Sequence, residues 1–215
     1  MDKTIIYYTC NVHKPQIDDL ARHFLSKVEL PKISVSLNKK IDFGDVRIVM
    51  KGQRNTLMMH KQIVKGLQAC KTKWAFLAES DVLYHPSHFD FIPQGRDAYY
   101  FNVNVWKMRW ADGFCVRTDS SQQLSGMVAD KKLLLDFFSS RVTEIEKNGF
   151  DSHYEPRDKP RINYESAYPN ICIRHDTNLT ISKWKISDFR NKKYAKGFKQ
   201  SSIENIPGWN AQEIL

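Results

Sequence analysis

Strand-like and helix-like patterns alternate along the first 80 residues, and this alternation limits the possible folds more than any other feature. A β-branched and aromatic run at 4–10 is typical of a strand, and Pro15 then opens a segment whose apolar residues keep helical spacing. The same patterns predict strands at 33–37, 46–50 and 74–77 and a second helix at 55–70. Because strands that alternate with helices pair in parallel and are covered on both faces, we predict an α/β fold. Its sheet is expected to be mixed, mainly parallel and flanked by helices, in a single domain.

The second half of the chain predicts further strands, one helix and a long loop. Strands are expected at 97–106, 113–117 and 171–174. Asp130 is a good N-cap for the helix behind it, which is expected to end at Asn148-Gly149. From 150 to 169 the sequence is polar and contains three prolines, which predicts a loop, and long ordered loops tend to carry function.

Two carboxylates follow the apolar strand at 74–77, in the sequence Glu79-Ser80-Asp81. Strand side chains repeat every two residues, so both acids are expected on the same side. Like charges this close repel one another unless a cation lies between them, and carboxylate oxygens suit Mg²⁺ or Mn²⁺ bridging to substrate phosphates. The alternative is a solvated acidic turn after a core strand.

Polar residues also follow two other predicted strands. Thr9 and Asn11 come at the end of the first strand, and Arg54 and Asn55 come at the start of the second helix. Open α/β sheets bind ligands at the carboxyl ends of their strands, and a guanidinium beside a helix N-terminus favours phosphate. These four residues are therefore predicted to bind a nucleotide. The alternative for Arg54 is a surface cation that caps its own turn.

The stretch 51–81, KGQRNTLMMHKQIVKGLQACKTKWAFLAESD, resembles the GT-A class of nucleotide-sugar glycosyltransferases. The similarity lies in an Arg-Asn helix start, an amphipathic helix and an apolar strand that ends in the metal-binding Asp-x-Asp. The chain departs from that pattern at Glu79, which replaces the first Asp, so Asp81 is the ligand that the resemblance supports best. The resemblance implies a Rossmann-like GT-A domain over 1–180, with 181–215 as a basic, aromatic-rich extension packed on it.

The same resemblance assigns further roles along the chain. A histidine on a late strand, here His175, is implied to complete the metal site with Asp81 and Glu79, and the cofactor is implied to be Mn²⁺ or Mg²⁺. Lys183 becomes a candidate for neutralising the leaving diphosphate. Trp106 and Trp110 follow the metal motif where such enzymes build acceptor pockets, and aromatic faces stack on sugars and bases. The alternative for both tryptophans is core packing.

An inverting transferase also needs a carboxylate base within reach of the acceptor hydroxyl. The polar loop supplies Glu155, which Tyr154 and Pro156 would hold in place, and Glu165 is the second candidate. Either acid could instead be a solvated loop residue. A retaining mechanism would need no such base.

The net charge of +9 favours a polyanionic partner. Basic residues of the last third, among them Lys192 and Lys193, alternate with aromatic residues, a mixture that suits nucleic acid better than a plain solvated face. No apolar run approaches the roughly 18 residues that span a bilayer, and the start of the chain lacks a secretory pattern. A cytoplasmic protein without a membrane span is therefore expected, and the oligomeric state is left open.

The sequence thus predicts a metal-dependent glycosyltransferase with a nucleotide-sugar donor, a UDP-sugar by resemblance. In its general build the chain is similar to phage enzymes that modify DNA bases in the host cytoplasm, which makes a hydroxymethylated base in DNA the first choice of acceptor. A lipid-linked or polysaccharide acceptor is the alternative within this class. A nucleotidyltransferase would share the sheet and the carboxylates, but residues 9–16 lack its Gly-rich and Lys signature. A non-enzymatic nucleic-acid-binding module would leave Glu79, Asp81 and His175 without a role.

Overall fold

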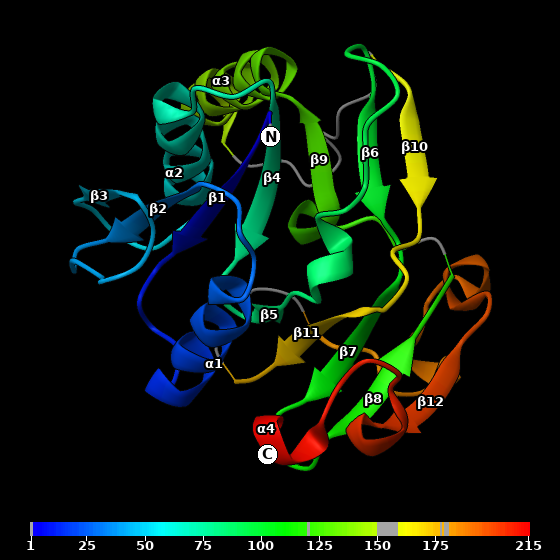
Figure 1. Cartoon of the computed structure of the whole chain (residues 1–215). Helices are drawn as coiled ribbons and strands as arrows, with labels where there is room; N and C mark the ends of the chain where they lie inside the picture. Colours follow the sequence, from blue (N-terminus) through cyan, green and yellow to red (C-terminus); the bar gives the residue numbers. More distant parts are fainter. Residues whose placement is uncertain (1, 120, 150–158, 177, 179–180) are drawn as a thin grey trace.

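The alternating segments of the first 80 residues form the centre of a seven-stranded sheet in the computed structural model (Figure 1). The structure describes residues 2–119, 121–149, 159–176, 178 and 181–215. In spatial order the strands of this first sheet are β10 (Arg161–Tyr164), β6 (Tyr99–Asn102), β9 (Met127–Asp130), β4 (Trp74–Glu79), β1 (Lys3–Thr9), β2 (Lys32–Leu37) and β3 (Val46–Met50).

The pairing within this sheet confirms the predicted mixed, mainly parallel α/β fold. β1 pairs in parallel with β2 and β4, β2 pairs in parallel with β3, and β10 pairs in parallel with β6. Only β9, among the described strands of this sheet, runs antiparallel to its neighbours β4 and β6. The chain leaves β1 toward β2 on one side and returns to β4 on the other, so the neighbouring carboxyl ends of β1 and β4 form a topological switch point.

Period-two alternation in the central strands separates two cores. Ile6 and Tyr8 of β1 face α2 (Thr56–Ala69) and α3 (Lys131–Asn148), two helices that pack against each other. Ile5 and Tyr7 point to the opposite face, which the segment after β5 (Val82–Leu83) covers with buried aromatic side chains. The helix predicted at 55–70 is α2, with Asn55 as its N-cap. Asp130 caps α3, which ends at Gly149 with φ of 79°, as predicted.

A second sheet of five strands was not predicted. Its order is β12 (Lys199–Ser202), β8 (Phe114–Arg117), β7 (Val105–Arg109), β11 (Asn170–Arg174) and β5 (Val82–Leu83). A third core cluster joins this sheet to α1 (Pro15–Ser26) and to buried isoleucines of the C-terminal segment, including Ile214 of α4 (Ala211–Ile214). Short 3-10 helices connect the elements: η1 (Pro86–His88), η2 (Leu124–Gly126), η3 (Ile186–Asp188), η4 (Lys192–Ala195) and η5 (Ile203–Asn205).

Two sequence predictions are corrected by this arrangement. The stretch 97–106, predicted as one strand, is split between the two sheets as β6 and β7, because the chain turns at Val103, whose carbonyl accepts from the N–H of Val105 (3.0 Å). The expected loop at 150–169 contains β10, which gains its hydrogen bonds from the edge strand β6. None of the helices in the described part of the chain is long and apolar enough to cross a membrane.

Candidate functional site

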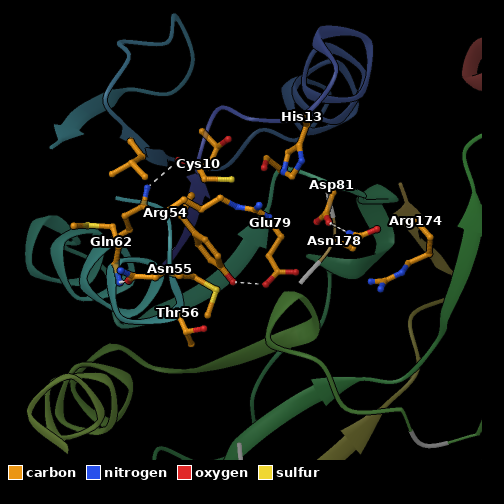
Figure 2. Close-up of a pocket in the computed structure, with 16 residues that line it drawn as sticks. Cys10, His13, Arg54, Asn55, Thr56, Gln62, Glu79, Asp81, Arg174 and Asn178 are labelled. Atoms are coloured by element: carbon orange, nitrogen blue, oxygen red, sulfur yellow. Dashed lines mark hydrogen bonds between the residues drawn. The ribbon is translucent and has the colours of Figure 1, made fainter. Parts of the chain in front are cut away.

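A cavity of about 450 Å³ opens at the switch point, where β1 and β4 end (Figure 2). Its lining combines the polar residues that follow β1, the start of α2, the end of β4 and the loop after β11. We call it the first cavity. The members used below are Thr9, His13, Arg54, Asn55, Gln62, Glu79, Asp81, Arg174 and Asn178.

Three side chains at this cavity can share one metal ion. One potential ligand atom from each of His13, Asp81 and His175 lies within 4.8 Å of the others. His175 Nε2 is 3.5 Å from Asp81 Oδ2, and the rings of the two histidines meet edge to face with centroids 4.5 Å apart. Burial lowers the pKa of His13, which favours the neutral imidazole that a metal requires.

Strand pairing brings these three ligands together. β5 starts directly after Asp81 and pairs antiparallel with β11, and the N–H of Ile173 donates to the carbonyl of Asp81 (2.7 Å). His175, just past β11, is thereby held beside Asp81. His13 comes from the loop between β1 and α1, at the neighbouring strand end.

The donor set fits a divalent cation. Metal–ligand bonds of about 2.0–2.2 Å allow two ligand atoms to stand about 3.5 Å apart around one ion. Asn178 Nδ2 donates to Asp81 Oδ2 (2.8 Å) and lies 3.3 Å from His175 Nε2, while the N–H of His175 donates to Asn178 Oδ1 (2.6 Å). Such outer contacts orient ligands. Two imidazoles with one carboxylate suit Mn²⁺ and other transition metals better than Mg²⁺, which prefers oxygen.

Glu79 lines the same cavity but lies outside this cluster. The strand ends at Glu79 and the chain turns at Ser80-Asp81. The alternation of strand side chains therefore does not extend to Asp81, and the two acids do not join one set of metal ligands. The carboxylate of Glu79 accepts from Tyr8 Oη (2.9 Å). Burial, and then the charge of Asp81, raise the pKa of Glu79.

The cavity also contains groups that can bind an anion. Arg54 reaches into it from the turn before α2, and Arg174 approaches from the end of β11 (Figure 2). Asn55 caps α2 by accepting from the N–H of Met58 (2.8 Å). Gln62, buried in α2, donates to the carbonyls of Thr9 and Val35 (2.9 Å each), which fixes the helix against the ends of β1 and β2. Two guanidinium groups and a fixed helix N-terminus suit the phosphates of a nucleotide.

Several predicted site residues lie elsewhere. Asn11 adopts φ of 56° and donates through its side chain to the carbonyl of Leu37 (2.7 Å), and it does not line the cavity. Lys183 lines a second cavity on the other sheet. Glu165 is exposed and accepts from Arg117 (2.7 Å), and Glu155 lies outside the described residues.

The predicted acceptor residues also fall in different places. Trp106 and Trp110 are partly buried against the third core cluster and line neither of the two cavities described here. Lys193 lines the second cavity, whereas its neighbour Lys192 does not and donates to the carbonyl of Ile186 (2.9 Å).

Four residues of the first cavity were missed in the sequence: His13, Gln62, Arg174 and Asn178. His13 could have been found, because it lies only two residues beyond Asn11 at the polar end of the first strand. Arg174 and Asn178 flank His175 in sequence, but only the pairing of β11 with β5 shows that they reach the first cavity.

A buried carboxyl beneath the site gives a prediction about pH. Asp18 of α1 is 7% exposed, its Oδ1 has no hydrogen-bond partner among the described residues, and burial raises its pKa from 3.8 to about 6. The folded state therefore holds this proton more tightly, so stability is lost as pH rises from 3.8 through about 6. Asp18→Asn should raise the free energy of unfolding by on the order of 1–3 kcal/mol at about pH 8, and much less at about pH 4.

Urea unfolding of the metal-free protein at both pH values measures this difference. Asp19→Asn is the matched control, since Asp19 is exposed on the same helix and pairs with Arg22 at 2.5 Å. A gain in stability that is equal at both pH values would contradict the assignment to ionisation of Asp18.

No protein-family model matches the chain, and no curated protein matches its sequence. Among solved structures it is similar to an inositol-1-phosphate CTP transferase from T. maritima, with a TM-score of 0.47, 10% identity and coverage of 84% of this chain and 92% of that chain. It is also similar to a nucleotidyl transferase from Methanothermobacter thermautotroptrophicus, with a TM-score of 0.46, 11% identity and coverage of 78% of this chain and 88% of that chain. For a glycosyltransferase involved in the glycosylation of the major capsid of PBCV-1, the TM-score is 0.41 and the identity 11%, with coverage of 77% of this chain and 82% of that chain. At these values the likenesses carry no argument about activity.

Proposed function

We propose that this protein is a metal-dependent transferase that takes a nucleotide sugar, a UDP-sugar, as donor and moves the sugar to a hydroxyl acceptor. The observation that carries the proposal is the meeting of two kinds of group in one cavity at the switch point. His13 and Asp81 line this cavity and, with His175 directly behind Asp81, offer ligand atoms close enough for one cation, while Arg54 and the start of α2 offer donors to an anion beside them. A nucleoside diphosphate needs both, because its charge is shared between a metal and cationic donors.

The residues of the chain would act mainly by binding and orienting the donor. His13, Asp81 and His175 would hold the cation, and a bound cation supplies positive charge that stabilises the leaving diphosphate. Arg54 and Arg174 would donate to phosphate oxygens, and Asn178 would keep Asp81 and His175 in position. Glu155 remains the proposed base for an inverting reaction. Glu165 is less suited to that role, because it already accepts from Arg117.

The proposed acceptor is a hydroxymethylated base in DNA. The net charge of +9 and the basic, aromatic-rich segment after residue 181 support a nucleic-acid partner. The protein, with Mn²⁺ or Mg²⁺, would be incubated with a panel of nucleotide sugars and with DNA that does or does not carry 5-hydroxymethylated pyrimidines. Sugar mass gained only by hydroxymethylated DNA is the expected result, and turnover of glycans or lipids alone would overturn this choice of acceptor.

A parallel incubation with nucleoside triphosphates and sugar phosphates in place of nucleotide sugars separates glycosyl transfer from nucleotidyl transfer. Glycosyl transfer breaks the bond between sugar and diphosphate and releases a nucleoside diphosphate. Nucleotidyl transfer from a nucleoside triphosphate releases pyrophosphate instead. Release of pyrophosphate, without release of a nucleoside diphosphate from any nucleotide sugar, would assign the protein to the second class.

Arg54 provides a test of the anion half of the cavity. Arg54→Gln should weaken UDP binding in the presence of Mn²⁺ about tenfold to a hundredfold, because a hydrogen bond to a charged group is worth roughly 1.5–3 kcal/mol. Calorimetry measures this loss, with metal affinity measured separately and expected to stay unchanged. Arg47→Gln serves as the control, since Arg47 lies on β3 outside the cavity and pairs with Asp42. Equal losses in both variants would indicate a general effect of net charge.

A further inference from the structure

A second cavity of about 720 Å³ lies over the five-stranded sheet, and none of the potential metal ligands lines it. Its floor comes from β7 and β8, and its wall comes from the segment after residue 181, which Figure 1 shows alongside β8 and β12. This volume falls within the roughly 300–1,000 Å³ of small-ligand pockets. The lining residues that matter here are Lys107, Arg117, Asp119, Lys183, Phe189, Lys193, Tyr194, Lys196 and Phe198.

The charge of this cavity is strongly one-sided. The described residues of its lining carry five cations and a single carboxylate, that of Asp119. Arg117 is already engaged with Glu165 and with Asn104 (2.7 Å each). Among the described residues, no carboxylate forms an ion pair with the four lysines of the lining. Cations gathered around one hollow repel one another unless an anion lies between them.

Lys107 shows this imbalance most clearly. It stands in the middle of β7, opposite Cys172 of β11 and Val116 of β8, and it is half-buried. Burial lowers the pKa of Lys107, and the nearby charges of Arg174 and Lys183 lower it further. A desolvated ammonium group without a counter-ion is costly, and a bound phosphate would offset that cost.

Aromatic rings share the cavity with these cations. Phe189 and Phe198 meet edge to face with centroids 5.9 Å apart, and Lys183 Nζ lies 4.8 Å above Phe189. Tyr194 is 62% exposed at the same cavity, with Lys193 Nζ 5.0 Å above its ring. Cations that interleave with accessible rings are the combination that holds a phosphate and stacks on a base.

We propose that the second cavity binds a nucleotide unit, with its phosphate among Lys107, Lys183 and Lys193 and its base against Tyr194. The unit comes either from a free nucleotide or from a single strand. The proposal deepens the proposed function only in naming where a nucleic-acid acceptor would be held. Binding here requires neither the metal nor the donor. The two sites are nevertheless neighbours, since Arg174 of the first cavity donates to Ser182 (2.7 Å), which is flanked by Ile181 and Lys183 of the second.

Binding to the metal-free protein in EDTA tests the proposal without the metal of the first site, and Arg54→Gln should bind the probes as the wild type does, because Arg54 lines only the first cavity. The probes are uridine monophosphate, ribose 5-phosphate as a phosphate without a base, and a labelled thymidine oligonucleotide of about 12 residues. We expect uridine monophosphate to bind to the wild type and to Asp81→Ala equally. Lys107→Met should weaken this binding about tenfold or more. Lys183→Met should also weaken it, and because Lys183 is exposed this second variant does not disturb the sheet.

Three further variants separate this cavity from a general basic surface. Tyr194→Ala should weaken uridine monophosphate about fivefold or more and leave ribose 5-phosphate unchanged, because stacking on a base is worth roughly 1–3 kcal/mol. Lys192→Met is matched to Lys193→Met on the same 3-10 helix, and only the second should weaken uridine monophosphate. If the oligonucleotide binds much more tightly than the mononucleotide, and its affinity falls with salt, the ligand of the second cavity is a single strand. If the two affinities are equal, the ligand is a free nucleotide.

Three results would overturn the proposal. The first is the absence of metal-independent binding of uridine monophosphate. The second is an equal loss in Lys192→Met and Lys193→Met. The third is ribose 5-phosphate binding as tightly as the nucleotide. A failure of metal-dependent UDP binding would affect only the first cavity, so the two proposals stand or fall separately.

Discussion

Asp81→Ala is expected to abolish metal-dependent binding of UDP while leaving the protein folded. Asp81 supplies the only carboxylate of the cluster His13, Asp81 and His175, among the described residues. Removing it leaves two imidazoles and no anionic ligand. Divalent cations that bind phosphates depend on carboxylate oxygens for charge balance, so the loss should exceed a hundredfold in metal affinity. Calorimetric titration of UDP with and without Mn²⁺ measures it.

A matched variant makes this expectation specific. Asp136 is an exposed carboxylate of α3 that pairs with Lys132 (2.7 Å) and does not line the first cavity, so Asp136→Ala removes the same charge outside the proposed metal site. It should bind Mn²⁺ and UDP as the wild type does. Unchanged UDP affinity in a folded Asp81→Ala protein would remove the metal from the proposed function, whatever the second cavity binds.

The fold of the first 80 residues could be predicted because its information is local. β-branched runs mark β1 and β2, Pro15 fixes the start of α1, and Asn55 supplies the cap of α2. The boundaries of β3 match the predicted ones fully. In this region the local preference of each segment agrees with the structure that the segment adopts in the fold. The parallel sheet can therefore be predicted from these local preferences.

The second sheet could not be predicted, because its strands depend on distant partners. β5 has two residues and exists through its pairing with β11, about 90 positions later. β12, with the polar sequence KQSS, is a strand because β8 offers it an edge. β10 lies in a segment that composition marks as a loop. Whether a segment forms a strand depends on the neighbouring strands and side chains against which it packs. The local sequence does not show which neighbours these will be.

The same distinction separates the site residues that were predicted from those that were missed. Asp81, Arg54 and Asn55 follow directly from strand ends and a helix start, and all of them line the first cavity. His13 enters the metal cluster through the geometry of a loop. Arg174 enters the first cavity because β11 joins the second sheet, and that sheet also carries Lys183 to another cavity.

The two histidines give the last expected result, because His175 was predicted from sequence and His13 was not. If both are ligands, His13→Ala and His175→Ala should each weaken Mn²⁺ binding by about a hundredfold, since each removes one bond to the ion. Both variants should stay folded. His13 is half-buried, so His13→Ala should change the melting temperature little, whereas the His175 side chain is only 5% exposed and His175→Ala should lower it measurably. In the wild type, Mn²⁺ should bind more tightly than Mg²⁺, and each variant should narrow this preference, because Mg²⁺ gains little from imidazole.

His23→Ala is the control, an exposed histidine at the end of α1. If His13→Ala binds Mn²⁺ normally while His175→Ala does not, then His13 is a packing neighbour of the His175 ring and the site has one imidazole ligand fewer than proposed.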